Sequence, residues 1–141
     1  MQTPIADIEV VDFGRIEAMK RKAWAAPNRR DRICLSEYRD GVQEMVIVLY
    51  QDSYIRPHRH PLNKSESYHV IEGELEVRIF NEDGSRNRTI KLDKQTPLYR
   101  MKNGWFHQPV SLTPVSVYHE ALQGPFNKEI DVEYASWAKE E

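Results

Sequence analysis

Three of the five histidines in this 141-residue sequence stand at spacings that could bring their side chains to one point. His58 and His60 are two residues apart, and residues two apart on a β-strand project from the same face. Glu66 follows six residues later, and His107 comes just after an expected turn at Lys102-Asn103-Gly104. Three imidazole nitrogens and one carboxylate oxygen suit a divalent first-row metal such as iron(II), manganese, nickel, cobalt or zinc.

Other titratable side chains near these positions have roles that the sequence leaves open. Tyr68 shares a predicted strand face with Glu66, so its phenol could act as an acid, a base or a substrate hydrogen bond, or could simply pack in the core. Glu120 could carry a proton, orient a ligand imidazole or only form a salt bridge. Strand alternation turns His69 to the outer face, and we interpret His119 as a structural histidine rather than a fifth ligand.

The elements that must position these side chains are mostly short strands. One helix is predicted at Asp12–Ala26, because Asp12 can cap its start and Ile16, Met19 and Ala23 fall on one face. The strand candidates, bounded by turn residues, are Arg32–Tyr38, Val42–Tyr50, Glu66–Glu72, Glu74–Phe80, Arg88–Leu92, Leu98–Met101, Gln108–Leu112 and Val115–Leu122. Strands this numerous and this closely spaced predict an all-β sandwich or small barrel with an N-terminal helix.

The length predicts a single domain over residues 1–141. We divide it into an N-terminal helical extension (1–31), a barrel (32–122) and a C-terminal tail (123–141). Phe126, Tyr134 and Trp137 in the tail need an apolar surface, so we expect an ordered tail that crosses the barrel on the outside.

Composition and charge exclude several classes of function. Twenty Lys and Arg against 22 Asp and Glu give a formal charge of −2, so there is no basic surface typical of nucleic-acid binding. The longest apolar run, Met45–Tyr50, is far shorter than the roughly 20 residues that cross a bilayer, so no membrane partner is expected. The start of the sequence, MQTPIADIEV, has no signal-peptide pattern, and Cys34 is the single cysteine. We therefore expect a cytoplasmic protein.

Two segments carry a resemblance to a known superfamily. PHRHPLNKSESYHVIEG resembles the first cupin motif, in which HxH is followed by Glu and then, seven residues on, by Gly. KNGWFH resembles the second motif, which ends in PxGxxH. The resemblance implies a cupin, a double-stranded β-helix or jelly-roll barrel with a metal inside, and it assigns metal ligation to His58, His60, Glu66 and His107.

A narrower resemblance covers most of the sequence. The N-terminal helix, Ala26-Pro27-Asn28-Arg29, YIRPHRHP, Gly124-Pro125-Phe126 and the closing FNKEIDVEYASWAKEE are similar to the WbuC-type cupin metalloproteins. That group is associated with bacterial surface-polysaccharide gene clusters. The resemblance implies a setting in sugar or glycan metabolism and no particular reaction.

These observations predict a metal-dependent enzyme that acts on a small molecule, with a sugar or sugar derivative as substrate. The ion would support isomerisation or epimerisation, with Tyr68 or Glu120 as the proton carrier. The alternatives are an iron(II)-dependent oxygenase, a non-catalytic small-molecule-binding cupin, and a metal-free enzyme whose histidines act as acid and base. By analogy with other cupins, we also expect a homodimer.

Overall fold

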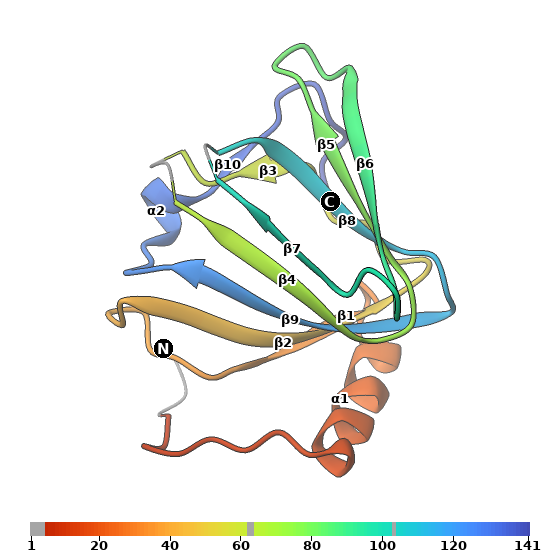
Figure 1. Ribbon diagram of the computed structural model, residues 1–141, viewed down its shortest axis with the longest axis vertical. Helices are drawn as coiled ribbons and strands as arrows, with labels where there is room; N and C mark the ends of the chain where they lie inside the picture. The colour runs from red at the N-terminus through yellow and green to blue at the C-terminus, as the bar shows by residue number, and fades with distance from the viewer. Residues whose placement is uncertain (1–4, 62–63, 103) are drawn as a thin grey trace.

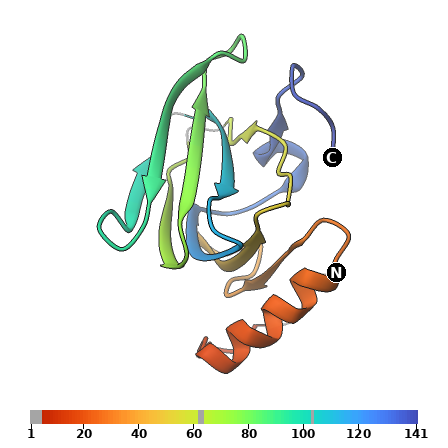
Figure 2. The same ribbon diagram turned by 90° about the vertical axis from the view of Figure 1, so that its right-hand side faces the viewer.

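The computed structural model describes residues 5–61, 64–102 and 104–141. Within these residues the strands form two five-stranded antiparallel sheets, in the orders β1-β2-β9-β4-β7 and β10-β3-β8-β5-β6 (Figures 1 and 2). The elements are α1 (Phe13–Ala25), β1 (Arg30–Cys34), β2 (Val42–Tyr50), β3 (His58–Arg59), β4 (Glu66–Glu72), β5 (Leu75–Phe80), β6 (Arg86–Leu92), β7 (Leu98–Met101), β8 (Phe106–Ser111), β9 (Val115–Gln123), α2 (Lys128–Asp131) and β10 (Glu133–Tyr134). The expected all-β architecture with one N-terminal helix before the strands is confirmed.

The helix α1 forms where the sequence predicts it. The side chain of Asp12 accepts a hydrogen bond from the backbone N–H of Arg15 at 2.8 Å, which caps the first turn. Ile16, Met19 and Ala23 are buried against β2 of the first sheet. The helix therefore covers the outer face of that sheet, on the side away from the second sheet (Figure 2).

The core between the sheets follows the alternation read from the sequence. Leu75, Val77 and Ile79 on β5 are buried, as the period-two pattern predicts. They pack in one cluster with Tyr68 of β4 and with residues of β2, β6 and β9. This cluster fixes the distance between the two sheets and hence the position of β4 relative to the second sheet.

Several strands have bounds that differ from the prediction by one or more residues, and β1 and β8 show why. β1 begins at Arg30, not at Arg32, because Arg30 is already in register with Leu49 of β2; the strand ends at Cys34, well short of Tyr38. β8 begins at Phe106, two residues before the predicted start, because Phe106 is in register with Phe80. The centre of the turn expected at residues 102–104, residue 103, lies outside the described residues.

The C-terminal strap (residues 124–141) was expected to cross the outside of the barrel, and in the structure it also joins a sheet. Its short strand β10 pairs with β3, with Tyr134 opposite His58, and so extends the second sheet. Trp137 lies against Phe80 and Phe106, with ring centroids 5.1 and 5.8 Å away. The strap is therefore part of the wall of the molecule next to β3.

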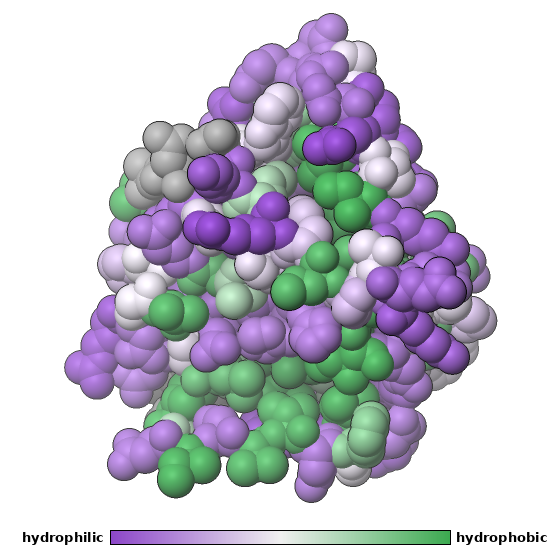
Figure 3. All heavy atoms as spheres, in the orientation of Figure 1, coloured by the Kyte–Doolittle hydropathy of each residue, from purple (hydrophilic) through white to green (hydrophobic). Residues whose placement is uncertain are grey.

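Apolar side chains gather on the surface near the N-terminal end. In Figure 3 a hydrophobic area occupies the part of the face where α1 and the segment before it lie in Figure 1. Ile8, Val10 and Phe13 are the strongly exposed apolar residues of this segment. Among the described residues no helix combines the length and the apolar character needed to cross a membrane.

We predict that Gly73→Ala destabilises the fold strongly. Gly73 has φ +77°, and a Cβ there would lie 2.5 Å from the carbonyl oxygen of Val115. The free energy of unfolding in urea should fall by about 2 kcal/mol or more. Gly41→Ala is the matched control, because a Cβ at Gly41 meets nothing within 4 Å, and it should change the value by less than about 1 kcal/mol. Equal unfolding midpoints for the two variants would contradict the prediction.

Candidate metal centre

The structure brings together the four side chains that the sequence singles out. The ligand atoms of His58, His60 and His107 all lie within 4.8 Å of one another. Nε2 of His60 is 3.0 Å from Oε2 of Glu66, and Nε2 of His107 is 2.9 Å from Oε1 of the same carboxylate. Glu66 is 1% exposed and His107 is 0% exposed, so the cluster lies in the interior.

Strand register produces this convergence. His58 on β3 and His107 on β8 are directly paired in the second sheet. Glu66 begins β4 in the first sheet and reaches the histidines from the opposite side. Between the two ligand positions of the HxH pair, Arg59 points the other way and binds Glu133 at 2.8 Å. The alternation that placed His58 and His60 on one face is therefore observed.

All three imidazoles are held through Nδ1 by backbone carbonyls. Each Nδ1 lies 2.7–2.9 Å from a carbonyl oxygen, which can only accept a hydrogen bond. The acceptors are the carbonyls of Arg56 for His58, of Asp131 for His60 and of Trp105 for His107. Nδ1 must therefore carry the proton, and Nε2 of each neutral ring keeps its lone pair for another partner.

The buried polar atoms at the centre lack the partners that they require. Oε2 of Glu66 and Nε2 of His107 are buried and have no hydrogen bond within the described part of the chain. The hydroxyl of Tyr99 donates a long hydrogen bond, 3.4 Å, to Oε1 of Glu66. Because buried polar atoms are normally satisfied, facing lone pairs of nitrogen and oxygen indicate a cation as the missing partner. This donor set fits a divalent transition metal.

The electrostatics keep His58 neutral and Glu66 ionised, which are the states in which these two side chains bind a metal. Burial, followed by the nearby charge of His107, lowers the pKa of His58 to about 3. Burial also acts to lower the pKa of His60 and of His107, but the Glu66 carboxylate outweighs it and raises both. Burial would raise the pKa of Glu66, but His107 and His60 outweigh it and hold this pKa well below its usual range. The carboxylate is therefore ionised, as a metal ligand must be.

A cavity of about 460 Å³ adjoins the cluster. His58 and His60 form part of its wall, whereas Glu66 and His107 lie deeper. The other walls come from β1, β2, β4, β8, β9 and the strap. The volume is typical of a site for a small molecule, which is usually about 300–1,000 Å³.

Tyr68 and Glu120 both line this cavity and are neighbours across the β4–β9 ladder. Burial, and then the charge of Glu66, raises the pKa of Tyr68 well above its usual value. Burial and then Glu66 likewise raise the pKa of Glu120 to about 7, although His60, His107 and a hydrogen bond from the Tyr68 hydroxyl act in the opposite direction. Glu120 does not orient a ligand imidazole, because backbone carbonyls hold all three Nδ1 atoms. That alternative is therefore wrong.

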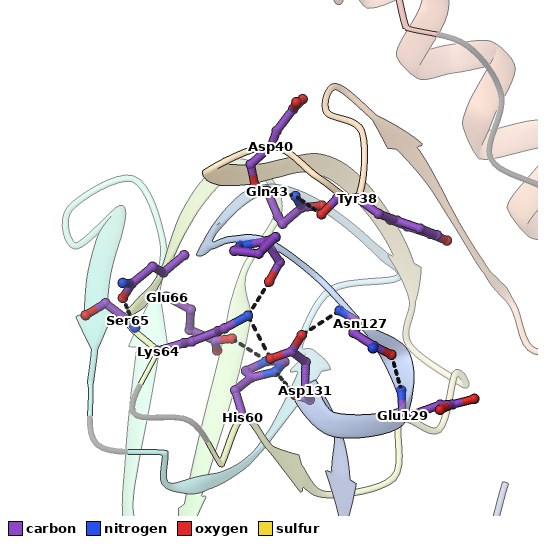
Figure 4. Close-up of polar contacts among 12 residues, drawn as sticks. Tyr38, Asp40, Gln43, His60, Lys64, Ser65, Glu66, Asn127, Glu129 and Asp131 are labelled. Atoms are coloured by element: carbon purple, nitrogen blue, oxygen red, sulfur yellow. Dashed lines mark hydrogen bonds and ion pairs between the residues drawn. The ribbon is translucent and has the colours of Figure 1, made fainter.

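The remaining histidines lie outside the cluster. His69 is exposed on the outer face, as predicted. Nε2 of His119 is 3.2 Å from Glu44, which fits the structural role expected for it. Sequence reasoning missed Tyr99 as a partner of Glu66, although the alternation in β7 could have placed it on the inner face. It also missed Asp131, whose contribution to His60 comes from the backbone (Figure 4).

Solved structures share this arrangement of sheets. CapF from Staphylococcus aureus, described as a capsular polysaccharide assembling protein, matches with a TM-score of 0.66 and 15% identity over 77% of this chain and 32% of CapF. Oxalate oxidase in complex with the substrate analogue glycolate matches with a TM-score of 0.59 and 14% identity over 78% of this chain and 57% of the oxidase. The chain thus spans about a third of CapF and just over half of the oxidase. Both are cupin-fold proteins, so this chain has the cupin fold.

Sequence comparison adds the family. No curated protein matches the sequence significantly. A family model described as a domain of unknown function, DUF6016, matches residues 11–92. The matched region runs from the start of α1 to the end of β6 and contains His58, His60 and Glu66, whereas His107 lies beyond it. Because the match covers more than half of the chain, this protein is a member of the DUF6016 family, and it has a cupin fold.

Proposed function

We propose that this protein is a metal-dependent cupin enzyme that acts on a small polyhydroxylated molecule of the sugar class. His58, His60, Glu66 and His107 would hold one divalent transition metal. The observation that carries the proposal is a set of three clustered imidazoles, each anchored through Nδ1, two of which direct Nε2 at a buried, ionised carboxylate. Such an arrangement is costly in the absence of a cation and is typical of a metal site.

When bound, the metal supplies a Lewis acid that polarises a carbonyl or hydroxyl oxygen of the substrate. The protein's own side chains would then move the proton. Glu120 faces the cavity with a pKa of about 7, so it can gain and lose a proton near neutral pH. Tyr68, next to it and neutral, would hold Glu120 in place by donating its one hydroxyl proton, and its oxygen could accept a hydrogen bond from a substrate hydroxyl.

The walls of the cavity support a sugar as the ligand. Tyr38, Phe126 and Tyr134 offer aromatic faces, and Asn28 and Asp31 offer polar groups for hydroxyls. The fold neighbour CapF, described as a capsular polysaccharide assembling protein, supports the same setting.

A second candidate is an oxygen-dependent reaction on a small acid with iron(II), favoured by the fold neighbour oxalate oxidase with bound glycolate. Oxygen uptake after loading with iron(II) tests this candidate, and turnover of a panel of sugar nucleotides tests the first. In the first case Glu120→Gln and Tyr68→Phe should lower kcat at least about 100-fold while metal content is unchanged. A protein that turns over neither class after metal loading would be a binding module.

We predict one tightly bound transition metal per chain in protein purified without chelator, measured by elemental analysis. Glu66→Gln and His107→Ala should each weaken metal binding more than about 100-fold, because each removes a direct ligand. His69→Ala is the matched control, since His69 lies on the same strand as Glu66 but is exposed on its outer face. A wild-type protein that binds no transition metal, or equal losses in the control, would rule out the site.

We also predict a pH-dependent stability that depends on Glu120. In metal-free protein its pKa is raised to about 7, so the folded state holds a proton that the unfolded state releases at lower pH. This contribution is complete below the ordinary carboxyl pKa and is lost as the pH rises through about 7. Glu120→Gln cannot ionise and should be more stable than the wild type at pH 8, by about 1–3 kcal/mol.

Urea unfolding with chelator present, at pH 5 and at pH 8, measures the difference. Glu140→Gln serves as the control because Glu140 is exposed, and it should follow the wild type at both pH values. A Glu120→Gln variant that loses as much stability as the wild type between pH 5 and pH 8 would refute the assignment.

A further inference from the structure

One carboxylate in the strap is buried without belonging to the metal cluster. Asp131, the last residue of α2, is 1% exposed. Its Oδ1 lies 2.7 Å from Nζ of Lys64, and its Oδ2 accepts a hydrogen bond from the backbone N–H of Asn127 at 2.5 Å. Figure 4 shows the Lys64 ammonium and the Asp131 carboxylate pointing at each other beside His60.

The same residue touches the metal cluster through its backbone. The Asp131 carbonyl accepts the Nδ1 hydrogen of His60 at 2.7 Å. The carbonyls that hold His58 and His107 come from residues two positions earlier on their own segments, whereas the carbonyl that holds His60 comes from 71 residues away. The orientation of His60 therefore depends on how the strap is docked.

Lys64 ties that docking to the other sheet. It stands two residues before Glu66, and its ammonium also donates to the carbonyl of Pro125 in the strap. The strap thus links the β3 end of the centre, through His60, to the β4 end, through Lys64. A buried ion pair adds little net stability compared with apolar packing, because desolvation offsets the attraction, but it does fix position. The carbonyl of Asp131 must be held in a fixed position if it is to keep the proton of His60 on Nδ1.

We propose that Asp131 is a positioning residue of the metal centre: the Lys64–Asp131 ion pair fixes the carbonyl that keeps Nε2 of His60 free, and so couples strap docking to metal binding. The inference rests on the proposed metal site and adds a device that acts on it from the strap. Phe126, Val132 and Tyr134 of the strap also line the cavity. Because coupling is reciprocal, a bound metal should hold this cavity wall in place.

Metal affinity of matched variants tests the proposal. Asp131→Asn and Lys64→Met each remove one charge of the pair and should weaken zinc binding about 10- to 100-fold. Glu133→Gln is the control: Glu133 also fastens the strap to β3, through Arg59 at 2.8 Å, but contacts no imidazole, so zinc binding should change less than about 3-fold. Equal losses in Asp131→Asn and Glu133→Gln would overturn the proposal, since the strap would then act only as a structural tether.

A second measurement needs no variant and no metal. Nitrogen-15 NMR of the metal-free wild type, at a pH above the raised pKa of His60, should show the His60 proton on Nδ1 and a bare Nε2, whereas Asp131→Asn should show a mixture of the two tautomers. A proton on Nε2 in the wild type would overturn the proposal. If the wild type does not bind zinc, the proposed function fails, but the tautomer of His60 still decides whether Asp131 positions it.

Hydrogen exchange of the strap reads the coupling in the other direction. Adding zinc to the wild type should slow amide exchange at residues 128–135, and this protection should shrink in Lys64→Met. Protection by zinc that is identical in the wild type and in Lys64→Met would contradict the coupling.

Discussion

The structure is organised around an ionised carboxylate that has been withdrawn from water. Moving such a group into the interior costs several kcal/mol unless charge and hydrogen bonds compensate for it. Glu66 has around it two imidazole nitrogens at about 3 Å and one distant tyrosine hydroxyl, and neither ring offers a proton unless it is charged. A cation shared between the carboxylate and the rings resolves this cost, and the surrounding elements can be understood as the means of holding four donors around it.

The two-sheet architecture meets that requirement in a direct way. Ligands that came from one sheet alone would lie in a plane, whereas Glu66 from the first sheet and the histidines from the second enclose a point between them. The β3–β8 pairing sets the distance between His58 and His107, and the packed core beneath them keeps the sheets apart. The cavity then occupies the part of the space between the sheets that the core leaves open.

Sequence periodicity predicted most of the strands and the residues of the site, but it could not predict the start of β8 or the position of the strap. The HxH pair, Glu66 and Tyr68 could be assigned to faces because a strand alternates strictly, and α1 because its cap and apolar face agree. The start of β8 could not be predicted. Phe106 belongs to the strand because it pairs with Phe80, and that residue is distant in sequence. The strap could not be placed either, because a two-residue strand has no periodicity. The backbone carbonyl of Asp131 could not be identified as a partner of His60, because every residue carries the same carbonyl group.

The anchoring of Trp137 has a bearing on how solutes move in and out of the molecule. Its ring lies over Gly84, where a Cβ would come within 2.8 Å of it, and against Phe80 and Phe106, so the far end of the strap is clamped to the β5–β6 hairpin. The near end is clamped by Lys64. Because the strap is fixed at both ends, its middle can move outward, but the strap cannot rotate away from the sheets about one end. The last residues are held as well, because Glu141 pairs with Arg30 and accepts a hydrogen bond from the backbone N–H of Arg56, so solutes should enter the cavity without a hinged opening of the strap.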